Sequence, residues 1–201
     1  DRPGAALARA TLSVNGWSVE TDRQIAIPYG GAALKPFTRY RAELTAVDDA
    51  GEEARAELTF ETGRLDTPWA GQWISDGAYS FTEKKVSPVP MTFRKTFALR
   101  GAVKEAKIRA TAMGVYQLTL NGAPVGNEYF APGFTSYKTN LQYQTYDVTG
   151  CLRADNTLTA VVAGGWAVGS FVFTRKNRVT ADRQALLLEL RVTYKDGTEE
   201  I

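Results

Sequence analysis

The stretch Val115-Tyr116-Gln117-Leu118-Thr119-Leu120-Asn121-Gly122 decides the fold class of this chain. Up to the turn, Val115, Gln117 and Thr119 alternate with Tyr116, Leu118 and Leu120, which is the two-residue period of a half-buried β-strand. The Asn-Gly pair tolerates the positive φ angles that a two-residue hairpin requires. Because Ala123–Gly126 returns directly after it, the sequence predicts a β-hairpin here.

Strand signals of this kind recur along the chain, and convincing helices are absent. Two further Asn-Gly or Asp-Gly turns, at Asn15-Gly16 and Asp196-Gly197, support the same reading. The only helical turn that we expect lies at Asp147–Leu152, where Asp147 or Thr149 could cap it. The sequence therefore predicts an all-β protein. We predict strands at Ala10–Val14, Arg39–Val47, Ala56–Glu61, Met91–Leu99, Ala106–Ala112, Val115–Leu120, Leu158–Val162, Phe171–Thr174 and Leu186–Tyr194.

A break in regularity near Gly63–Pro68 divides the chain, so we predict two domains, residues 1–63 and residues 64–201. The first is shorter than the roughly 100 residues of a complete sandwich, so we expect its N-terminal strands to be missing. The last residues resemble a hairpin whose second strand has just begun. We therefore expect the second domain to lack its C-terminal strands.

Composition excludes several classes of function. The 201 residues include no histidine and a single cysteine, Cys151, which removes His-dependent catalysis, His-zinc sites and internal disulfides. The net charge is only +2, and no apolar run approaches the roughly 20 residues of a membrane span. We expect neither a nucleic-acid partner nor a membrane span. The chain begins without a methionine or a signal-like stretch, so its targeting signals assign no compartment.

Carboxylates are the remaining candidates for catalytic groups, because glycosidases need only two of them. The densest cluster, Asp48, Asp49, Glu52 and Glu53 around Gly51, has the spacing of a polar hairpin tip. No pair has an apolar setting that would suit a general acid. We therefore expect no catalytic residue in this chain.

A glycine-flanked tryptophan and an aromatic loop are the best candidates for binding a sugar. Trp166 follows Gly164-Gly165, and Tyr137 ends the stretch 129–137, which is rich in aromatic side chains. An indole or phenol face suits the C–H face of a pyranose, although the alternative that both rings belong to the core stays open. Asn127, Glu128 and Asn177 carry oxygens that could bind sugar hydroxyls or a calcium ion, or could be solvated loop residues.

Several of these motifs, in this order and spacing, resemble the N-terminal domain of bacterial α-L-rhamnosidases. They are the hairpin at residues 115–126, Ala131-Pro132-Gly133-Phe134-Thr135-Ser136-Tyr137, Tyr143-Gln144-Thr145-Tyr146-Asp147-Val148-Thr149 and Gly164-Gly165-Trp166. Upstream, Tyr29-Gly30-Gly31, Tyr40-Arg41-Ala42-Glu43-Leu44 and Phe60-Glu61-Thr62-Gly63 resemble the fibronectin-III-like domain that precedes it.

The resemblance implies a truncated fibronectin-III-like β-sandwich followed by a jelly-roll, galactose-binding-like β-sandwich. It also implies a parent enzyme that releases terminal α-L-rhamnose with inversion, by means of a catalytic (α/α)₆ domain outside this chain. This segment would be noncatalytic and would support or bind rhamnose-containing glycosides, with Trp166 and Tyr137 stacking on the sugar. Calcium would lie at Asn127, Glu128 and Asn177. Two alternatives stay open, a purely structural spacer without ligand affinity and a sugar-binding domain of another glycosidase.

Overall fold

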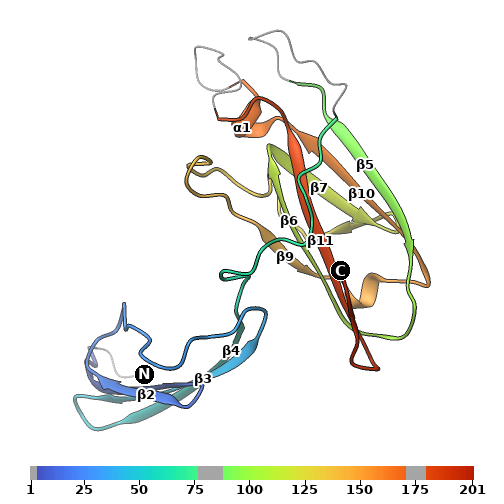
Figure 1. Ribbon diagram of the computed structural model, residues 1–201. Helices are drawn as coiled ribbons and strands as arrows, with labels where there is room; N and C mark the ends of the chain where they lie inside the picture. Colours follow the sequence, from blue (N-terminus) through green and yellow to red (C-terminus); the bar gives the residue numbers. More distant parts are fainter. Residues whose placement is uncertain (1–3, 77–87, 171–179) are drawn as a thin grey trace. The chain divides into compact units, whose positions relative to one another are not determined.

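The computed structural model describes residues 4–76, 88–170 and 180–201, and it is almost entirely β-structure (Figure 1). The chain divides into two compact units, Asp1–Pro68 and Trp69–Ile201. The division lies a few residues beyond the predicted one. The predicted all-β class is confirmed. None of the described helices has the length and apolar character needed to cross a membrane.

The first unit contains one antiparallel sheet in the order β2-β1-β3-β4. Its strands are β1 (Leu7–Val14), β2 (Trp17–Thr21), β3 (Arg39–Asp48) and β4 (Glu53–Glu61). One face is apolar: Leu12 lies opposite Leu44, and Ala42 opposite Leu58. The connection from β2 to β3 contacts this face, where the ring of Tyr29 packs edge-on against Trp17 at 5.1 Å.

The acidic cluster of this unit lies at the β3–β4 turn, as predicted. A carboxylate oxygen of Asp48 accepts hydrogen bonds from the backbone N–H groups of Ala50 and Glu52, both at 2.8 Å. This carboxylate therefore stabilises a turn.

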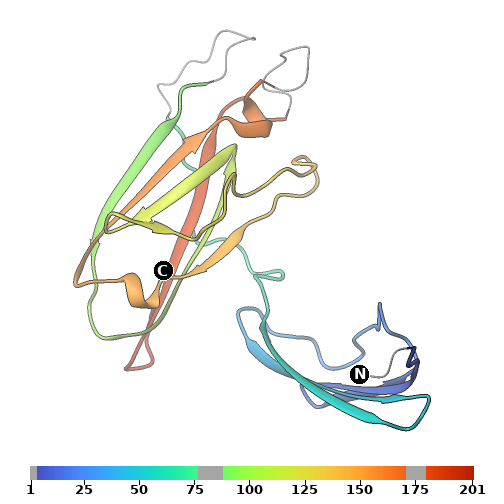
Figure 2. The ribbon, with the colours of Figure 1, turned by 180° about the vertical axis from the view of Figure 1, so that it is seen from behind.

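The second unit is a sandwich of two four-stranded antiparallel sheets, seen from opposite sides in Figures 1 and 2. One sheet has the order β5-β10-β7-β8 and the other β12-β11-β6-β9. The strands are β5 (Met91–Ala98), β6 (Val103–Met113), β7 (Val115–Leu120), β8 (Ala123–Val125), β9 (Gln144–Asp147), β10 (Asp155–Ala163), β11 (Ala185–Tyr194) and β12 (Glu199–Glu200). The hairpin predicted at Asn121-Gly122 is confirmed as β7–β8.

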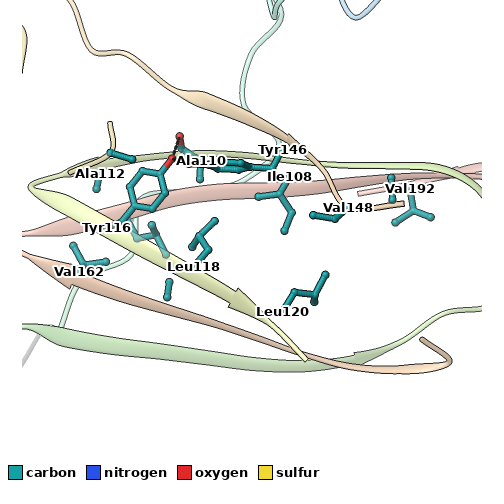
Figure 3. Packing of buried hydrophobic residues seen from close by; sticks show 14 of the residues in the cluster. Ile108, Ala110, Ala112, Tyr116, Leu118, Leu120, Tyr146, Val148, Val162 and Val192 are labelled. Carbon is teal, nitrogen blue, oxygen red and sulfur yellow. Dashed lines mark hydrogen bonds between the residues drawn. The ribbon is translucent and has the colours of Figure 1, made fainter. Parts of the chain in front are cut away.

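The core lies between these two sheets, because alternate residues of each strand point inward (Figure 3). From one sheet come Leu118, Leu120 and Val162, and from the other Ile108 and Val192, all of them almost fully buried. Between β6 and β7 the chain passes from the sheet β12-β11-β6-β9 to the sheet β5-β10-β7-β8. Gly114 makes that transition at a φ of +134°, which favours glycine.

The outward face of β6 and β11 is covered by the segment Trp69–Ser75. Ile74 forms a β-bridge with Leu186, and the ring of Trp69 packs edge-on against Tyr143 at 5.7 Å. Beneath this cover, Arg109 and Glu189 lie opposite each other in register and are nearly inaccessible to water. The backbone N–H of Ala70 donates a hydrogen bond to the Glu189 carboxylate at 3.1 Å.

Two short helical segments complete the described structure. The 3₁₀ turn η1 (Thr149–Cys151) falls within the single helical turn predicted there, and Asp147 accepts hydrogen bonds from the backbone N–H and the hydroxyl of Thr149. The helical turn α1 (Gly165–Val168) was not predicted. The strand expected at Phe171–Thr174 lies outside the described residues.

Candidate functional site

The candidate site residues of the second unit fall into two groups. Asn127 and Glu128 follow β8, whereas Tyr137 and Trp166 meet in a small cluster beside α1. Asn177, the fifth candidate, lies outside the described residues. The structure therefore brings together the two oxygen-bearing residues and, separately, the two aromatic ones.

Asn127 and Glu128 line a pocket of about 270 Å³ at the β7–β8 hairpin, which we call the Glu128 pocket. Neither Trp166 nor Tyr137 belongs to its lining. Tyr129, which is 88% exposed, provides an aromatic ring at this pocket. The complete lining is Tyr116, Gln117, Leu118, Pro124, Val125, Gly126, Asn127, Glu128, Tyr129 and Tyr146.

The Glu128 side chain folds back over the start of its own loop. One carboxylate oxygen accepts a hydrogen bond from the backbone N–H of Asn127 at 3.1 Å. Gly126 has a φ of +76°, and a Cβ on it would overlap both this carboxylate and the ring of Tyr146. Glycine at position 126 therefore allows the carboxylate to lie against the tyrosine ring.

The charge of Glu128 acts on two buried phenols of the pocket. The hydroxyls of Tyr116 and Tyr146 are 3.0 Å apart, and the Tyr116 hydroxyl also lies 3.1 Å from the carbonyl oxygen of Ala110 (Figure 3). Burial first, then the hydrogen bond to Tyr146 and the nearby charges of Tyr146 and Glu128, raise the pKa of Tyr116 far above its ordinary value. Burial and Glu128 also raise the pKa of Tyr146, against an opposing effect of the Tyr116 hydrogen bond.

These raised pKa values predict a loss of stability in alkali. Above the ordinary tyrosine pKa of about 10, a phenol ionises in the unfolded chain but stays protonated in the fold, so unfolding becomes easier as the pH rises. For Tyr116 we expect a loss of about 1 kcal/mol by roughly pH 10.5. Urea unfolding of the wild type and Tyr116→Phe at pH 7 and pH 10.5 measures it.

Two variants separate this effect from general alkaline damage. Because Tyr116→Phe lacks the hydroxyl hydrogen bonds, its free energy of unfolding at pH 7 should be about 1 kcal/mol lower than that of the wild type. Its stability should then fall less than that of the wild type as the pH rises. Tyr129→Phe, at the exposed ring, should keep the wild-type pH dependence. Equal pH dependence in wild type and Tyr116→Phe would contradict the prediction.

Around Tyr137 and Trp166, two phenylalanines join the second group, so that it has one buried ring and three accessible ones. Tyr137 is only 8% exposed, and its hydroxyl donates to the carbonyl of Gly133 at 3.0 Å. Its ring packs in a cluster with Ala167 and Val168 of α1, so it offers no open face to a sugar. Burial also raises the pKa of Tyr137.

Phe130, Phe134 and Trp166 form an accessible patch, which we call the aromatic surface. Both phenylalanine rings meet Trp166 edge-to-face, with centroids 5.8 Å away for Phe130 and 6.1 Å for Phe134. Phe130 is 66% exposed and Phe134 is 61% exposed, whereas Trp166 is half-buried. Stacking on a sugar was predicted for Trp166 and Tyr137, whereas the exposure of Phe130 and Phe134 was not predicted. Their neighbours in an irregular loop give no periodicity from which exposure could be predicted.

Asn127 and Glu128 do not by themselves form a complete metal site. Calcium takes six to eight oxygen ligands, and Asn127 and Glu128 supply two side chains of suitable chemistry. Within residues 4–76, 88–170 and 180–201, no three His, Cys, Asp or Glu side chains cluster so that they could hold a metal ion. A calcium ion bound here would need further oxygens, such as backbone carbonyls, water or sugar hydroxyls.

The second unit is therefore a jelly-roll-type sandwich that carries a polar pocket and an aromatic surface on its loops. Two family models match the chain. Residues 101–201 match the family model described as the alpha-L-rhamnosidase N-terminal domain, and residues 6–66 match the Rha78A-like, N-terminal immunoglobulin domain. The chain belongs to the family of α-L-rhamnosidase N-terminal domains.

Individual relatives agree with this assignment. An alpha-L-rhamnosidase of Streptomyces avermitilis is 46% identical over 99 residues, which is 49% of this chain and 10% of that protein. One of Formosa agariphila is 30% identical over 159 residues, 76% of this chain and 17% of that protein. The chain thus spans less than a fifth of the length of either relative.

A solved structure shows the same fold. The Streptomyces avermitilis alpha-L-rhamnosidase complexed with L-rhamnose superposes with a TM-score of 0.80 over 99% of this chain and 37% of that chain. The two sequences are 20% identical. This likeness therefore supports the fold and not the position of a ligand.

Proposed function

We propose that this chain is a noncatalytic part of an α-L-rhamnosidase that binds rhamnose-containing glycosides for a catalytic domain elsewhere in the same polypeptide. The family assignment supports the parent activity, and the Glu128 pocket carries the binding role. A carboxylate accepts hydrogen bonds from sugar hydroxyls, and these charge-assisted bonds are stronger than neutral ones. The pocket adds an amide at Asn127 and an exposed aromatic ring at Tyr129, which suit the hydroxyls and the C–H face of one sugar.

The charge state of the pocket favours this role. Among the described residues, no Lys or Arg forms an ion pair with Glu128. An exposed carboxylate without a fixed counter-ion keeps lone pairs for a hydroxyl or a cation. A calcium ion bound by Asn127 and Glu128 is part of the same proposal, with sugar hydroxyls completing its coordination.

Calorimetric titration with methyl α-L-rhamnoside, with calcium and then with a chelator, tests the proposal. We expect binding heat that the chelator reduces, and a loss of at least about tenfold in affinity in Glu128→Gln, which removes the charge and keeps the shape. Glu52→Gln, at the β3–β4 turn, is the matched control. The same preparation should leave an aryl α-L-rhamnoside unhydrolysed.

One observation favours a different role, that of a structural spacer. Tyr137 is buried and Trp166 half-buried, so the aromatic loop also stabilises itself. A spacer would give no heat with rhamnoside under either metal condition, and that result would replace the binding proposal.

A further inference from the structure

Each unit of the chain has an Asn-Gly pair at the tip of a hairpin, and the two asparagines have different surroundings. The turn Asn15-Gly16 joins β1 to β2, and the turn Asn121-Gly122 joins β7 to β8. In both turns the asparagine and the glycine have positive φ angles, and a Cβ on the glycine would meet nothing within 4 Å. The two sites therefore share their sequence and backbone conformation, and they differ in what holds the asparagine side chain.

An asparagine followed by glycine can undergo a reaction of its own. The backbone nitrogen of the glycine loses its proton to hydroxide and attacks the carbon of the side-chain amide. The bond from that carbon to the amide nitrogen breaks, so a cyclic imide forms and ammonia leaves. Water then opens the imide at one of its two carbonyl carbons and gives aspartate or isoaspartate. Glycine favours the attack because it has no Cβ to hinder the approach.

The side chain of Asn121 is held away from this reaction by three hydrogen bonds. Its nitrogen donates to the carbonyl of Cys151 at 3.0 Å and to the side-chain oxygen of Asn156 at 2.9 Å. Its oxygen accepts from the backbone N–H of Thr157 at 2.9 Å. Asn156 is itself fixed, since it is 3% exposed and bonds to the backbone of Arg153. Closing the imide requires the side-chain amide to turn toward the glycine nitrogen, which breaks all three bonds.

Asn15 has no such restraint. Its side chain is exposed, and neither this side chain nor the N–H of Gly16 forms a hydrogen bond with any residue that the structure describes. β2 is an edge strand of five residues, so the tip of the hairpin opens without breaking the pairing of β1 with β3. The Asn15 amide is therefore free to rotate toward the glycine nitrogen whenever the turn opens.

We propose that Asn15 is a site of spontaneous deamidation in the folded protein, and that its hydrogen bonds protect Asn121 from the same reaction. The product replaces a neutral amide with a carboxylate at the β1–β2 turn. Isoaspartate also lengthens the backbone within a two-residue turn, which disturbs the pairing of Val14 with Trp17. Trp17 packs against Tyr29 at 5.1 Å, so the change reaches the connection that contacts the apolar face of this sheet.

Peptide mapping by mass spectrometry tests the proposal on the whole chain, aged in mildly alkaline buffer with and without denaturing urea. In urea, Asn15 and Asn121 should deamidate at similar rates, because both precede glycine and neither side chain is held. In the folded chain, Asn121 should react at least about tenfold more slowly than Asn15, since three hydrogen bonds must break before the imide closes. The Asn15 product should include isoaspartate, which forms only through the imide.

Two variants test the source of the protection. Asn156→Ala removes one partner of Asn121 and should speed deamidation there, while Asn15 in the same molecules keeps its rate. Asn140→Ala, at an exposed asparagine between β8 and β9, is the matched control and should change neither rate. If circular dichroism shows that Asn156→Ala is unfolded, the comparison of the wild type in buffer and in urea decides alone.

Three results would overturn the inference. The first is equal rates at Asn15 and Asn121 in the folded wild type. The second is an Asn15 that stays an amide in the folded chain although it reacts in urea. The third is a folded Asn156→Ala variant in which Asn121 reacts no faster than in the wild type, because the protection would then not come from the hydrogen bonds.

Discussion

Gly114→Ala is expected to lower the free energy of unfolding of the second unit by about 3 kcal/mol. Gly114 has a φ of +134°, and a Cβ there would overlap the carbonyl oxygen of Ala163. The left-handed backbone costs roughly 1–2 kcal/mol for a residue with a Cβ. Forced repacking around the new carbon adds roughly 1–3 kcal/mol. Urea unfolding followed by tryptophan fluorescence measures the sum.

Gly122→Ala is the matched control for this prediction. Gly122 also has a positive φ, +85°, but a Cβ on it would meet nothing within 4 Å. The variant should therefore lose only about 1 kcal/mol, from its backbone conformation alone. Equal losses in Gly114→Ala and Gly122→Ala would show that the passage between the two sheets at Gly114 tolerates a side chain.

Asn121→Ala is expected to cost the second unit about 3 kcal/mol as well, for a different reason. The Asn121 amide nitrogen donates to the carbonyl of Cys151 at 3.0 Å and to the side-chain oxygen of Asn156 at 2.9 Å. Its oxygen accepts from the backbone N–H of Thr157 at 2.9 Å. Together the three bonds contribute about 2 kcal/mol net. The φ of +54° further disfavours alanine.

Two substitutions resolve these contributions. Asn121→Gly keeps the backbone conformation and removes the hydrogen bonds, so it should lose about 2 kcal/mol. Asn15→Ala changes the other Asn-Gly hairpin, whose asparagine has a φ of 50° and no side-chain hydrogen bond to a described residue. It should cost the first unit about 1 kcal/mol, measured on that unit's own transition. A cost for Asn15→Ala as large as that for Asn121→Ala would contradict the hydrogen-bond explanation.

The two Asn-Gly turns also show what a sequence pattern can and cannot predict. Alternation and turn chemistry are local, so both turns followed from the sequence, and the strand Val115–Leu120 has the bounds predicted for it. The strand β2 after Asn15-Gly16 was not predicted. The partners of Asn121 lie 30 to 36 positions away along the chain. No local signal distinguishes it from Asn15.

The elements that the sequence did not predict depend on their neighbours for stability. β9 is only Gln144–Asp147 and is mostly polar, and it becomes a strand because it pairs with β6. α1 is a four-residue turn that begins with glycine, a poor helix former. Its Ala167 and Val168 are buried with Tyr137, so tertiary packing outweighs the low propensity.

The candidate site was predicted in part. Asn127 and Glu128 were singled out as oxygen-bearing loop residues, and the structure adds that they share a pocket with two buried phenols. The sequence could not distinguish Tyr137 from Phe134, because both lie in an irregular loop. Their orientation depends on the turn at Gly133 and on the hydrogen bond from Tyr137 to it, which are features of the folded chain.

The cover formed by Trp69–Ser75 has a consequence for the order in which the chain folds during synthesis. The sheet of the first unit needs only the hairpins β1–β2 and β3–β4 and the connection between β2 and β3. Ile74, in contrast, cannot form its bridge until Leu186 has been synthesised, more than a hundred residues later. At roughly 5–20 residues per second, the ribosome leaves this apolar segment without its partner for several seconds or more. The second unit therefore completes late, and its first residues are the ones that a chaperone or a neighbouring nascent chain would meet.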